Sequence, residues 1–446
     1  MRSFRSAFGE AEPAYFIRAP GRINLIGEHT DYNGFPVMPF AISRAIYAAV
    51  APRDDKLVKL QNLQGEEYGP REFCIEKSIP PHPQGDWANY FKASVQGLLA
   101  RFQGQQSHLR DLRGFSCLVD GNIPPAAGLS SSSALVIAGA LAFCAVNDIE
   151  MPRPYLATLL AEAEQYVGTR GGGMDQAICL MAKETHVLKI DFFPLRISPA
   201  PFPRDHCILA AHSTVPAAKT ENQMEAYNQR VLECTLGTAL LARLTRNGNA
   251  ERLADLVDEA AGRGPSELSH ELADLLSGQD TVTVRQIARL WNLEVSDFRK
   301  WLQSKTAIDA IPAPSQKLKV LPRCRHVFSE ARRVQQALNS LRAGDIEALG
   351  RLMNQSHRSC AQDYEISCKE LDELVALMRE AGAAGARLTG AGFGGFAIGL
   401  VRKSAVSAVR ESLNMDFYQV RNGSADDYVF EFTPQEGASV TELDRP

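Results

Sequence analysis

The chain has 446 residues, more than one ordinary hydrophobic core accommodates, so we expect two or three structural units. Lysine and arginine (48 residues) nearly balance aspartate and glutamate (52), which gives a net charge of -4 and no basic stripe of the kind that binds nucleic acid. The nine cysteines are scattered without a CxxC pair, which argues against a disulfide framework and against a zinc site. There is no apolar stretch of signal-peptide length and no run of about 18 apolar residues. We therefore expect a cytoplasmic protein with small-molecule partners and no nucleic-acid or membrane partner.

Strand-like and helix-like segments are interleaved along the first half of the chain. Short apolar runs rich in β-branched and aromatic residues predict strands at 45–52, 115–124, 186–195 and 206–215. The longer apolar run at 133–147 predicts a largely buried helix.

The pattern becomes almost wholly helical from about Lys219 to Ala343, and residues 281–303 have the alternating polar and apolar faces of a small helical lobe that could be an insertion. Strands are predicted again at 396–401 and 428–434. They follow a helix whose apolar face holds Leu371, Leu374, Val375 and Met378. Because no low-complexity linker or internal repeat separates these segments, we expect two closely packed α+β domains.

The segment RAPGRINLIGEHTDYNG, residues 18–34, combines arginine, glutamate, histidine and aspartate with three glycines. A core strand does not need this mixture, whereas a site for a polyhydroxylated ligand does. Carboxylates and an imidazole, as in Glu28, His29 and Asp31, supply the directional hydrogen bonds that sugar hydroxyls require. Any one of these residues alone would more often be an ordinary polar surface residue or a turn residue.

The segment GNIPPAAGLSSSSALVIAGAL, residues 121–141, predicts a strand, a turn marked by proline and glycine, and four serines that open an apolar helix. Serine and glycine at this point leave backbone N–H groups free at the positive end of the helix, which suits a phosphate. An ordinary serine N-cap with spare serines is the alternative. No GxxxxGK[ST] sequence occurs, which excludes the ordinary P-loop.

In RLTGAGFGGFAIGLV, residues 387–401, Gly390, Gly392 and Gly395 have GxGxxG spacing. A dinucleotide-binding fingerprint needs a strand before the glycines and a helix after them. Here we expect the reverse, a helix before and an apolar strand after, so a glycine-rich hairpin with close backbone packing is the better interpretation.

The segment GTRGGGMDQAICLM, residues 168–181, places Asp175 after a run of glycines. A lone aspartate at such a place is usually a turn or helix-cap residue. Beside a sugar hydroxyl, however, a carboxylate accepts or orients the proton, and a guanidinium such as that of Arg22 favours its charged form and neutralises developing phosphoryl charge.

These four motifs, in this order, resemble those of the galactokinase family, which belongs to the superfamily of galactokinase, homoserine kinase, mevalonate kinase and phosphomevalonate kinase (GHMP kinases). The family loop usually carries glycine or serine where Ala126 and Ala127 stand. The resemblance implies an α+β, two-domain GHMP kinase fold. Its ribosomal protein S5 domain 2-like N-terminal domain would span 1–205, and its ferredoxin-like C-terminal domain would span 206–446 with a helical insertion at about 235–320.

The resemblance also implies a role for each matching residue. Asp175 and Arg22 would be catalytic. The sugar would be bound by Arg22, Glu28, His29, Asp31, Gly172, Asp175 and Tyr227. The nucleotide would be bound by Gly128, Leu129, Ser130, Ser131, Ser132 and Ser133, with Trp87 in DWANYFKA (86–93) either beside the adenine or in the core. Magnesium would be held by Ser132 and Glu164, with Glu162 as the alternative carboxylate.

The activity implied is magnesium-dependent transfer of the γ-phosphate of ATP to the anomeric O1 hydroxyl of galactose by a monomeric enzyme. N-acetylgalactosamine is the alternative substrate, because LMNQSHRSC (352–360) and other segments are closest to that branch of the family, whereas HTDYNG and Tyr227 are typical of galactokinases. A non-catalytic sugar sensor is less well supported, because Arg22, Asp175 and the serine loop, as we call residues 128–133, are all present. The complete GEHTDY string argues against mevalonate and homoserine but not against arabinose.

Overall fold

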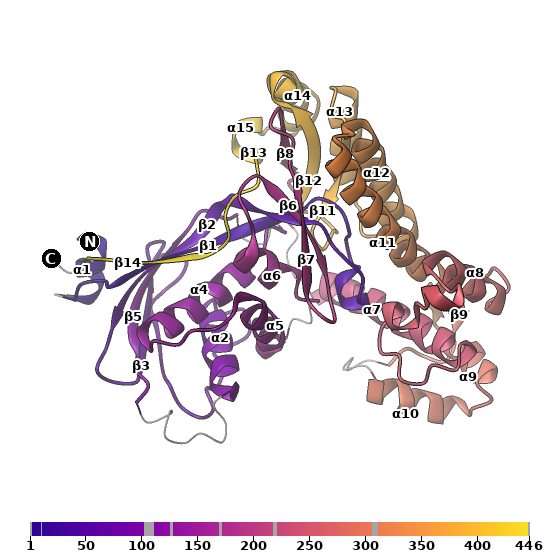
Figure 1. Cartoon of the computed structure of the whole chain (residues 1–446), viewed down its shortest axis with the longest axis horizontal. Helices are drawn as coiled ribbons and strands as arrows, with labels where there is room; N and C mark the ends of the chain where they lie inside the picture. The colour runs from indigo at the N-terminus through magenta and orange to yellow at the C-terminus, as the bar shows by residue number, and fades with distance from the viewer. Residues whose placement is uncertain are drawn as a thin grey trace.

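The structure is a computed structural model that describes residues 2–9, 11–101, 111–124, 128–168, 172–216, 221–305 and 311–444. Two β-sheets with helices packed against them lie side by side, and a lobe of helices extends from the second sheet (Figure 1). The two ends of the chain lie close together at the edge of the first sheet (Figure 1).

The first sheet has six strands in the order β14-β1-β2-β5-β3-β4, antiparallel except for the β3–β5 pair. Its strands are β1 (Tyr15–Asn24), β2 (Pro39–Pro52), β3 (Leu57–Asn62), β4 (Arg71–Cys74), β5 (Phe115–Gly121) and β14 (Ser439–Glu442). A separate hairpin of β6 (His186–Asp191) and β7 (Arg196–Pro201) adjoins this sheet through a bridge between Val37 and Ile190.

Four helices cover one face of the first sheet: α2 (Ala88–Arg101), α4 (Ser131–Val146), α5 (Arg153–Ala163) and α6 (Met174–Met181). Helix α4 is apolar around almost its whole circumference because it packs between the sheet and α2. Gly139 allows this approach, since a Cβ there would lie 2.6 Å from Ser94 Oγ. The short helix α1 (Arg2–Phe8) packs on the opposite face through Phe4, against Ala51 and Leu118.

The second sheet is antiparallel, in the order β11-β12-β8-β13. Its strands are β8 (His206–His212), β11 (Gly385–Thr389), β12 (Phe396–Arg402) and β13 (Val429–Phe432). The helices of this part are α11 (Val320–Ala343), α12 (Ile346–Ser359), α13 (Lys369–Glu380), α14 (Val406–Leu413) and α15 (Ala425–Tyr428). A π-helical turn at Cys360–Tyr364 follows α12.

The helical lobe comprises α7 (Glu221–Leu244), α8 (Pro265–Leu275), α9 (Val284–Leu290), α10 (Val295–Lys305) and the short strand pair β9 (Val282–Thr283) and β10 (Lys317–Leu318). Its outer part packs around Trp291, Phe298 and Leu302. The long helix α11 runs from this lobe to the second sheet (Figure 1). Short 3-10 turns lie at Asp31–Asn33, Glu164–Val167, Leu253–Leu256, Glu259–Ala261, Lys403–Ala405 and Gln419–Arg421.

The strands and helices expected from the sequence are present within a few residues of the predicted ranges, and the α+β architecture is confirmed. The expectation of a helix directly before the glycines at 390–395 is wrong, because β11 lies there. The expected boundary between the two domains, at residue 205, leaves out one strand of the first sheet. This strand is β14, near the C-terminus, which pairs with β1. All nine cysteines are free thiols, and all except Cys74 and Cys368 are buried.

Candidate active site

Arg22 and Asp175 form a bidentate ion pair between β1 and the first turn of α6. Arg22 Nε donates to Asp175 Oδ1 at 2.8 Å, and Arg22 Nη2 donates to Oδ2 at 3.2 Å. A register irregularity between Pro20 and Arg22 marks the point where this side chain leaves the strand. The Asp175 side chain retains 24% exposure, compared with 8% for Arg22. A carboxylate held firmly on one side and open on the other can receive a proton from a ligand.

The serine loop contacts the same ion pair. Ser130 has a left-handed backbone (φ 63°) at the N-terminus of α4, and its Oγ donates to Asp175 Oδ2 at 2.5 Å instead of capping the helix. Arg22 Nη1 donates to the carbonyl oxygen of Gly128 at 2.5 Å. The ordinary N-cap interpretation therefore does not describe Ser130. The departures from the family at Ala126 and Ala127 lie outside the described residues.

The other loop residues differ in accessibility. Ser131 and Ser132 are partly exposed in the first turn of α4, where backbone N–H groups have no partner within the helix. The side chains of Leu129 and Ser133 are buried, so these residues would contact a nucleotide through their backbone alone. Gly21 allows the loop to approach β1, because a Cβ there would lie 2.7 Å from Leu129 O.

The glycine hairpin between β11 and β12 lies against the serine loop. A Cβ on Gly390 would lie 3.0 Å from Gly128 O, and Gly390 has a positive φ of 86°. Because a strand follows these glycines, the hairpin interpretation is confirmed and the dinucleotide-binding fingerprint is excluded.

Asp31 brings the sugar motif, as we call residues 18–34, next to Asp175. Gly172 N–H donates to Asp31 Oδ2 at 3.1 Å, and a Cβ on Gly172 would lie 2.4 Å from Tyr32 N, so only glycine fits this approach. Burial, with a further contribution from the charges of Asp175 and Glu28, raises the pKa of Asp31 to about 6. The two carboxylates thus share one partly desolvated site.

His29 is held on both sides of its ring. A carbonyl can only accept, so Nε2–H donates to Ala391 O at 3.1 Å, and Nδ1 accepts from the Tyr32 hydroxyl at 2.9 Å. Burial lowers the pKa of His29 to about 3, so the ring is neutral. Its ring centroid lies 5.4 Å from that of Tyr227 and 4.9 Å from that of Tyr364, so both tyrosines belong to one aromatic cluster with His29.

Glu28 is bound by protein groups on both carboxylate oxygens. Arg387 Nη1 and Gly390 N–H donate to Oε1 at 3.1 and 3.0 Å, and Asn24 Nδ2 donates to Oε2 at 2.9 Å. Its exposure is 2%. The structure thus places the Glu28 carboxylate in a buried network that joins the sugar motif to β11 and the glycine hairpin.

Trp87 lies in the core. It packs edge-on against Phe91, and its indole N–H donates to Gly69 O. Of the two interpretations of this residue, the core one fits. A pocket of about 290 Å³ nearby is lined by Pro81, His82, Gln84, Gly85, Asp86, Asn89, Tyr90, Tyr166, Val167 and Gly168. Tyr90, three residues after Trp87, is thus the aromatic residue of this segment that reaches the pocket.

Glu164, and not Glu162, is the carboxylate that lies inside the molecule. Glu164 has 6% exposure and begins the 3-10 turn that continues to Tyr166 and Val167, whereas Glu162 is exposed. Burial raises the pKa of Tyr90, and the charge of Glu164 adds to this effect. A serine hydroxyl and a carboxylate are hard oxygen donors that suit magnesium. In the described part of the chain, no three His, Cys, Asp or Glu residues gather in a group that could hold a metal ion.

Three residues at or beside the site were missed in the sequence: Tyr90, Tyr364 and Arg387. An aromatic residue in DWANYFKA was a usable signal for Tyr90. Arg387 stands three residues before Gly390, in the strand that leads into the hairpin. Nothing local indicates that the π-helical turn directs the Tyr364 hydroxyl to Tyr32, 2.7 Å away.

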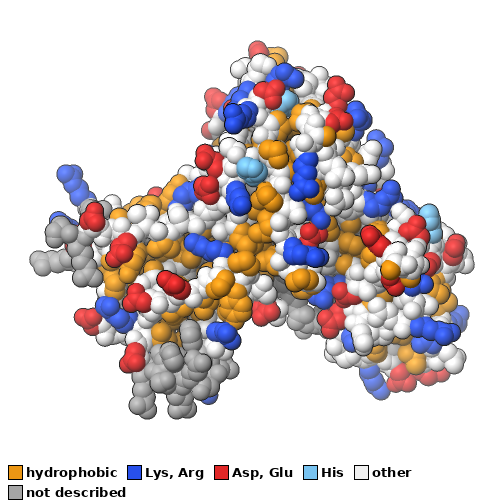
Figure 2. Space-filling model, viewed as in Figure 1, with side chains coloured by type: hydrophobic (Ala, Val, Ile, Leu, Met, Phe, Trp, Pro, Cys, Tyr) orange, Lys and Arg blue, Asp and Glu red, His pale blue; other side chains and the backbone are white. Residues whose placement is uncertain are grey.

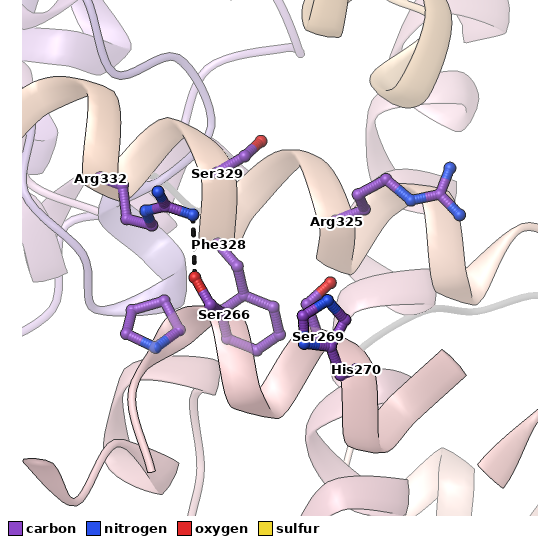
Figure 3. A pocket seen from close by; sticks show the side chains of 8 residues that line it. Ser266, Ser269, His270, Arg325, Phe328, Ser329 and Arg332 are labelled. Atoms are coloured by element: carbon purple, nitrogen blue, oxygen red, sulfur yellow. Dashed lines mark hydrogen bonds between the residues drawn. The ribbon is translucent and has the colours of Figure 1, made fainter. Parts of the chain in front are cut away.

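A second pocket, of about 200 Å³, lies between α8 and α11 in the helical lobe (Figure 3). Arg332 donates to Ser266 Oγ across its rim at 2.8 Å. None of the expected site residues lines it. On the face shown in Figure 2, acidic and basic side chains are interspersed.

Known families match three parts of the chain. Residues 2–52 match the model of the galactokinase galactose-binding signature, residues 89–183 that of the GHMP kinases N terminal domain, and residues 337–419 that of the GHMP kinases C terminal region. A galactokinase from Dictyostelium discoideum is 32% identical over 98% of this chain and 92% of its own length.

The chain belongs to the galactokinase family.

Other family members are similar over nearly the whole length. A galactokinase from Bacillus subtilis is 32% identical over 96% of this chain and 95% of its own. The crystal structure of Lactococcus lactis galactokinase complexed with galactose matches with a TM-score of 0.75 and 28% identity, covering 99% of this chain and 98% of that one. A mevalonate kinase structure, at 16% identity and a TM-score of 0.56, shares the fold alone. Among the described residues, we find no helix with the length and apolar character needed to cross a membrane.

Proposed function

We propose that this family member is a galactokinase that transfers the γ-phosphoryl group of ATP to the anomeric O1 hydroxyl of galactose, giving galactose 1-phosphate and ADP. One observation carries the proposal. Asp175 receives hydrogen bonds from Arg22 and from Ser130 at the point where the sugar motif meets the serine loop. A proton acceptor and a phosphate cradle therefore share a single site.

In the proposed reaction, Asp175 orients the O1 hydroxyl and accepts its proton. The O1 atom bonds to the γ-phosphorus while the bond from that phosphorus to the β,γ-bridging oxygen breaks, and ADP leaves. Arg22 holds the carboxylate through Nε and Nη2 and places positive charge beside the transferred group. Because the transition state of such transfers is loose, positioning and charge stabilisation contribute more than strong base catalysis.

The sugar would lie between Asp31, Gly172, His29 and Tyr227 on the acceptor side. Asp31 is 3.1 Å from the Gly172 backbone, and ionised carboxylates accept strong hydrogen bonds from hydroxyls. His29 and Glu28 have protein partners on their polar atoms, so they would shape the pocket at least as much as they contact the sugar.

The triphosphate would lie against the serine loop and the glycine hairpin, with the backbone N–H groups of the first turn of α4 facing it. The adenine would enter the pocket lined by Tyr90 and Tyr166, which offers aromatic rings and the imidazole of His82. Ser132 and Glu164 would hold magnesium. When bound, magnesium neutralises charge on the phosphate oxygens. A monomeric state and a cytoplasmic location stay predictions.

We propose galactose rather than N-acetylgalactosamine as the substrate for two reasons. The relatives named above, which match nearly the whole chain, are galactokinases, and residues 2–52 match a galactose-binding signature. The deciding experiment offers the purified protein ATP, magnesium and, separately, galactose, N-acetylgalactosamine, glucose, arabinose and mevalonate, and ranks kcat/KM. We expect galactose to rank first. A preference for N-acetylgalactosamine would contradict the sugar assignment, and binding of galactose without turnover would favour a sensor.

A further inference from the structure

Three charged side chains are buried together, one from the sugar motif and two from the second half of the chain. Glu28 follows β1, Glu330 lies on α11 and Arg387 lies on β11, and their exposures are 2%, 0% and 0%. Burying charged groups costs several kcal/mol unless each is closely paired. The cluster joins a segment of the first 30 residues to two elements from the last third of the chain, so it fixes how the two halves of the site meet.

The Glu28 carboxylate connects the sugar motif directly to the glycine hairpin. Its Oε1 accepts from Arg387 Nη1 at 3.1 Å and from Gly390 N–H at 3.0 Å. Gly390 is the residue that lies against Gly128 in the serine loop. The same oxygen therefore contacts the segment that would cover the phosphates, while Asp31, only three residues from Glu28, lies beside Asp175.

Arg387 and Glu330 also hold the backbone of the sugar motif. Arg387 Nη1 donates to Asn24 O at 3.3 Å, and Gly27 N–H donates to Glu330 Oε1 at 2.9 Å. Ser356 bridges the pair, since its Oγ donates to Glu330 Oε1 at 2.5 Å and accepts from Arg387 Nε at 3.0 Å. Burial alone would raise the pKa of Glu330, but the positive charges of Arg333 and Arg387 lower it to about 2.

We propose that Arg387 and Glu330 are positioning residues for phosphoryl transfer. They contact Glu28, Asn24 and Gly27, and so fix the position of residues 24–31 relative to the hairpin at 390–391. In this arrangement the attacking sugar hydroxyl lies in line with the bond that breaks at the γ-phosphate. The inference rests on the proposed kinase function and deepens it. A displacement of the two segments by about 1 Å is enough to slow such a reaction by two orders of magnitude.

The test uses two variants of the full-length protein. Arg387→Lys keeps the charge but loses the planar fork that reaches Glu28, Asn24 and Ser356 together. Glu330→Gln keeps the volume and can still accept from Gly27 N–H, but it loses the charge. We expect kcat per active site to fall about 10- to 100-fold for Arg387→Lys and about 3- to 10-fold for Glu330→Gln. The KM values for galactose and ATP should change by less than about three-fold. Active sites are counted by calorimetric titration with a nonhydrolysable ATP analogue.

Two variants in α14 serve as controls. Arg410→Lys makes the same exchange at an arginine whose fork donates to Val429 O, and Leu413→Ala removes a fully buried side chain to lower Tm. Both should keep the kcat of the wild type. If the folded Arg387→Lys and Glu330→Gln variants also kept the kcat of the wild type and only their Tm fell, the proposed positioning role would be wrong. If Arg387→Lys does not fold, the kcat of Glu330→Gln alone tests the role. Absence of galactose turnover in the wild type would instead contradict the proposed function.

Discussion

The imidazole of His29 joins the sugar motif to the glycine hairpin, because its Nε2–H donates to the carbonyl oxygen of Ala391 at 3.1 Å. Its other nitrogen accepts from the Tyr32 hydroxyl, which lies 2.7 Å from the Tyr364 hydroxyl. One neutral ring thus connects the acceptor side of the site, the aromatic cluster and the segment proposed to cover the phosphates.

We expect His29→Ala to weaken the binding of both substrates. The change removes a buried ring that hydrogen-bonds both Ala391 O and the Tyr32 hydroxyl, at a cost of about 1–2 kcal/mol. Steady-state kinetics should show KM for galactose and for ATP each raised about 5- to 30-fold. His186→Ala, at a histidine bonded only to local groups, is the control. A change in the galactose KM alone would show that His29 does not act on the hairpin.

The second prediction concerns the ion pair of Arg22 and Asp175. Asp175→Asn removes the proton acceptor but keeps its shape, so kcat should fall by about two to four orders of magnitude while the affinity for ATP hardly changes. Arg22→Ala should also lower kcat. Because the two side chains share two hydrogen bonds, the losses in the double variant should be much less than additive.

The pH dependence of Asp31 gives a third prediction. Its pKa is about 6 in the folded protein, above the ordinary value of 3.8, so the folded state binds this proton more tightly than the unfolded state. Ionisation of Asp31 therefore lowers the free energy of unfolding. The loss is absent below about pH 4 and reaches about 3 kcal/mol above pH 6. Urea unfolding should show Asp31→Asn to be more stable than the wild type at pH 7.5 and equal to it near pH 4.

Sugar affinity should follow the opposite trend. The ionised form of Asp31 is the acceptor for sugar hydroxyls, so the galactose affinity of the wild type should fall as the pH drops through 6. Asp31→Ala should raise the galactose KM by a factor that corresponds to about 2–3 kcal/mol and should leave ATP affinity unchanged. Titration with galactose and, separately, with an ATP analogue measures both. Loss of nucleotide affinity with sugar affinity kept would overturn the assignment of residues 28–31.

Most of the site residues that the sequence predicts lie in short motifs rich in polar residues and glycine. Arg22, Asp31, Gly172 and Asp175 were recognised because each stands in a string whose residue types suit one chemistry, and the structure brings them together. Elements with weak local signals were missed. The segment SVTE of β14 gives little indication of pairing with β1, and Gly385–Thr389 forms a strand because β12 lies beside it.

Side-chain direction was also beyond the sequence. Ser130 stands where a capping serine is expected, yet its left-handed backbone turns the hydroxyl to Asp175, 45 residues away in the sequence. Glu28 lies in the sugar motif, yet its carboxylate points to Arg387, 359 residues away. Such partners depend on how the two sheets meet, which no local pattern records.

A fourth prediction separates the two candidate magnesium carboxylates. Glu164→Gln should raise the magnesium concentration needed for half-maximal activity about ten-fold, because a neutral amide is a much weaker ligand for a hard divalent cation. Glu162→Gln is the matched control, since Glu162 is two residues away but exposed, and it should behave as the wild type. Titration of activity with magnesium at saturating ATP gives both values. A shift in Glu162→Gln alone would reverse the assignment.

The last prediction tests the contact between the glycine hairpin and the serine loop. In Gly390→Ala the new methyl group would lie 3.0 Å from Gly128 O and 3.2 Å from Gly128 Cα, so the loop must shift by a few tenths of an ångström. Its φ of 86° adds backbone strain. We expect KM for ATP to rise about 5- to 30-fold and galactose affinity to stay within about three-fold.

Gly382→Ala is the matched control for this variant. Gly382 also has a positive φ, of 104°, but a Cβ there meets nothing within 4 Å. Both variants therefore carry the strain of a left-handed alanine, of the order of 1 kcal/mol, while only Gly390→Ala presses on the serine loop. Calorimetric titration with an ATP analogue and with galactose compares them. Equal ATP affinity in the two variants would mean that the hairpin does not contribute to the nucleotide site, even if the protein remained an active kinase.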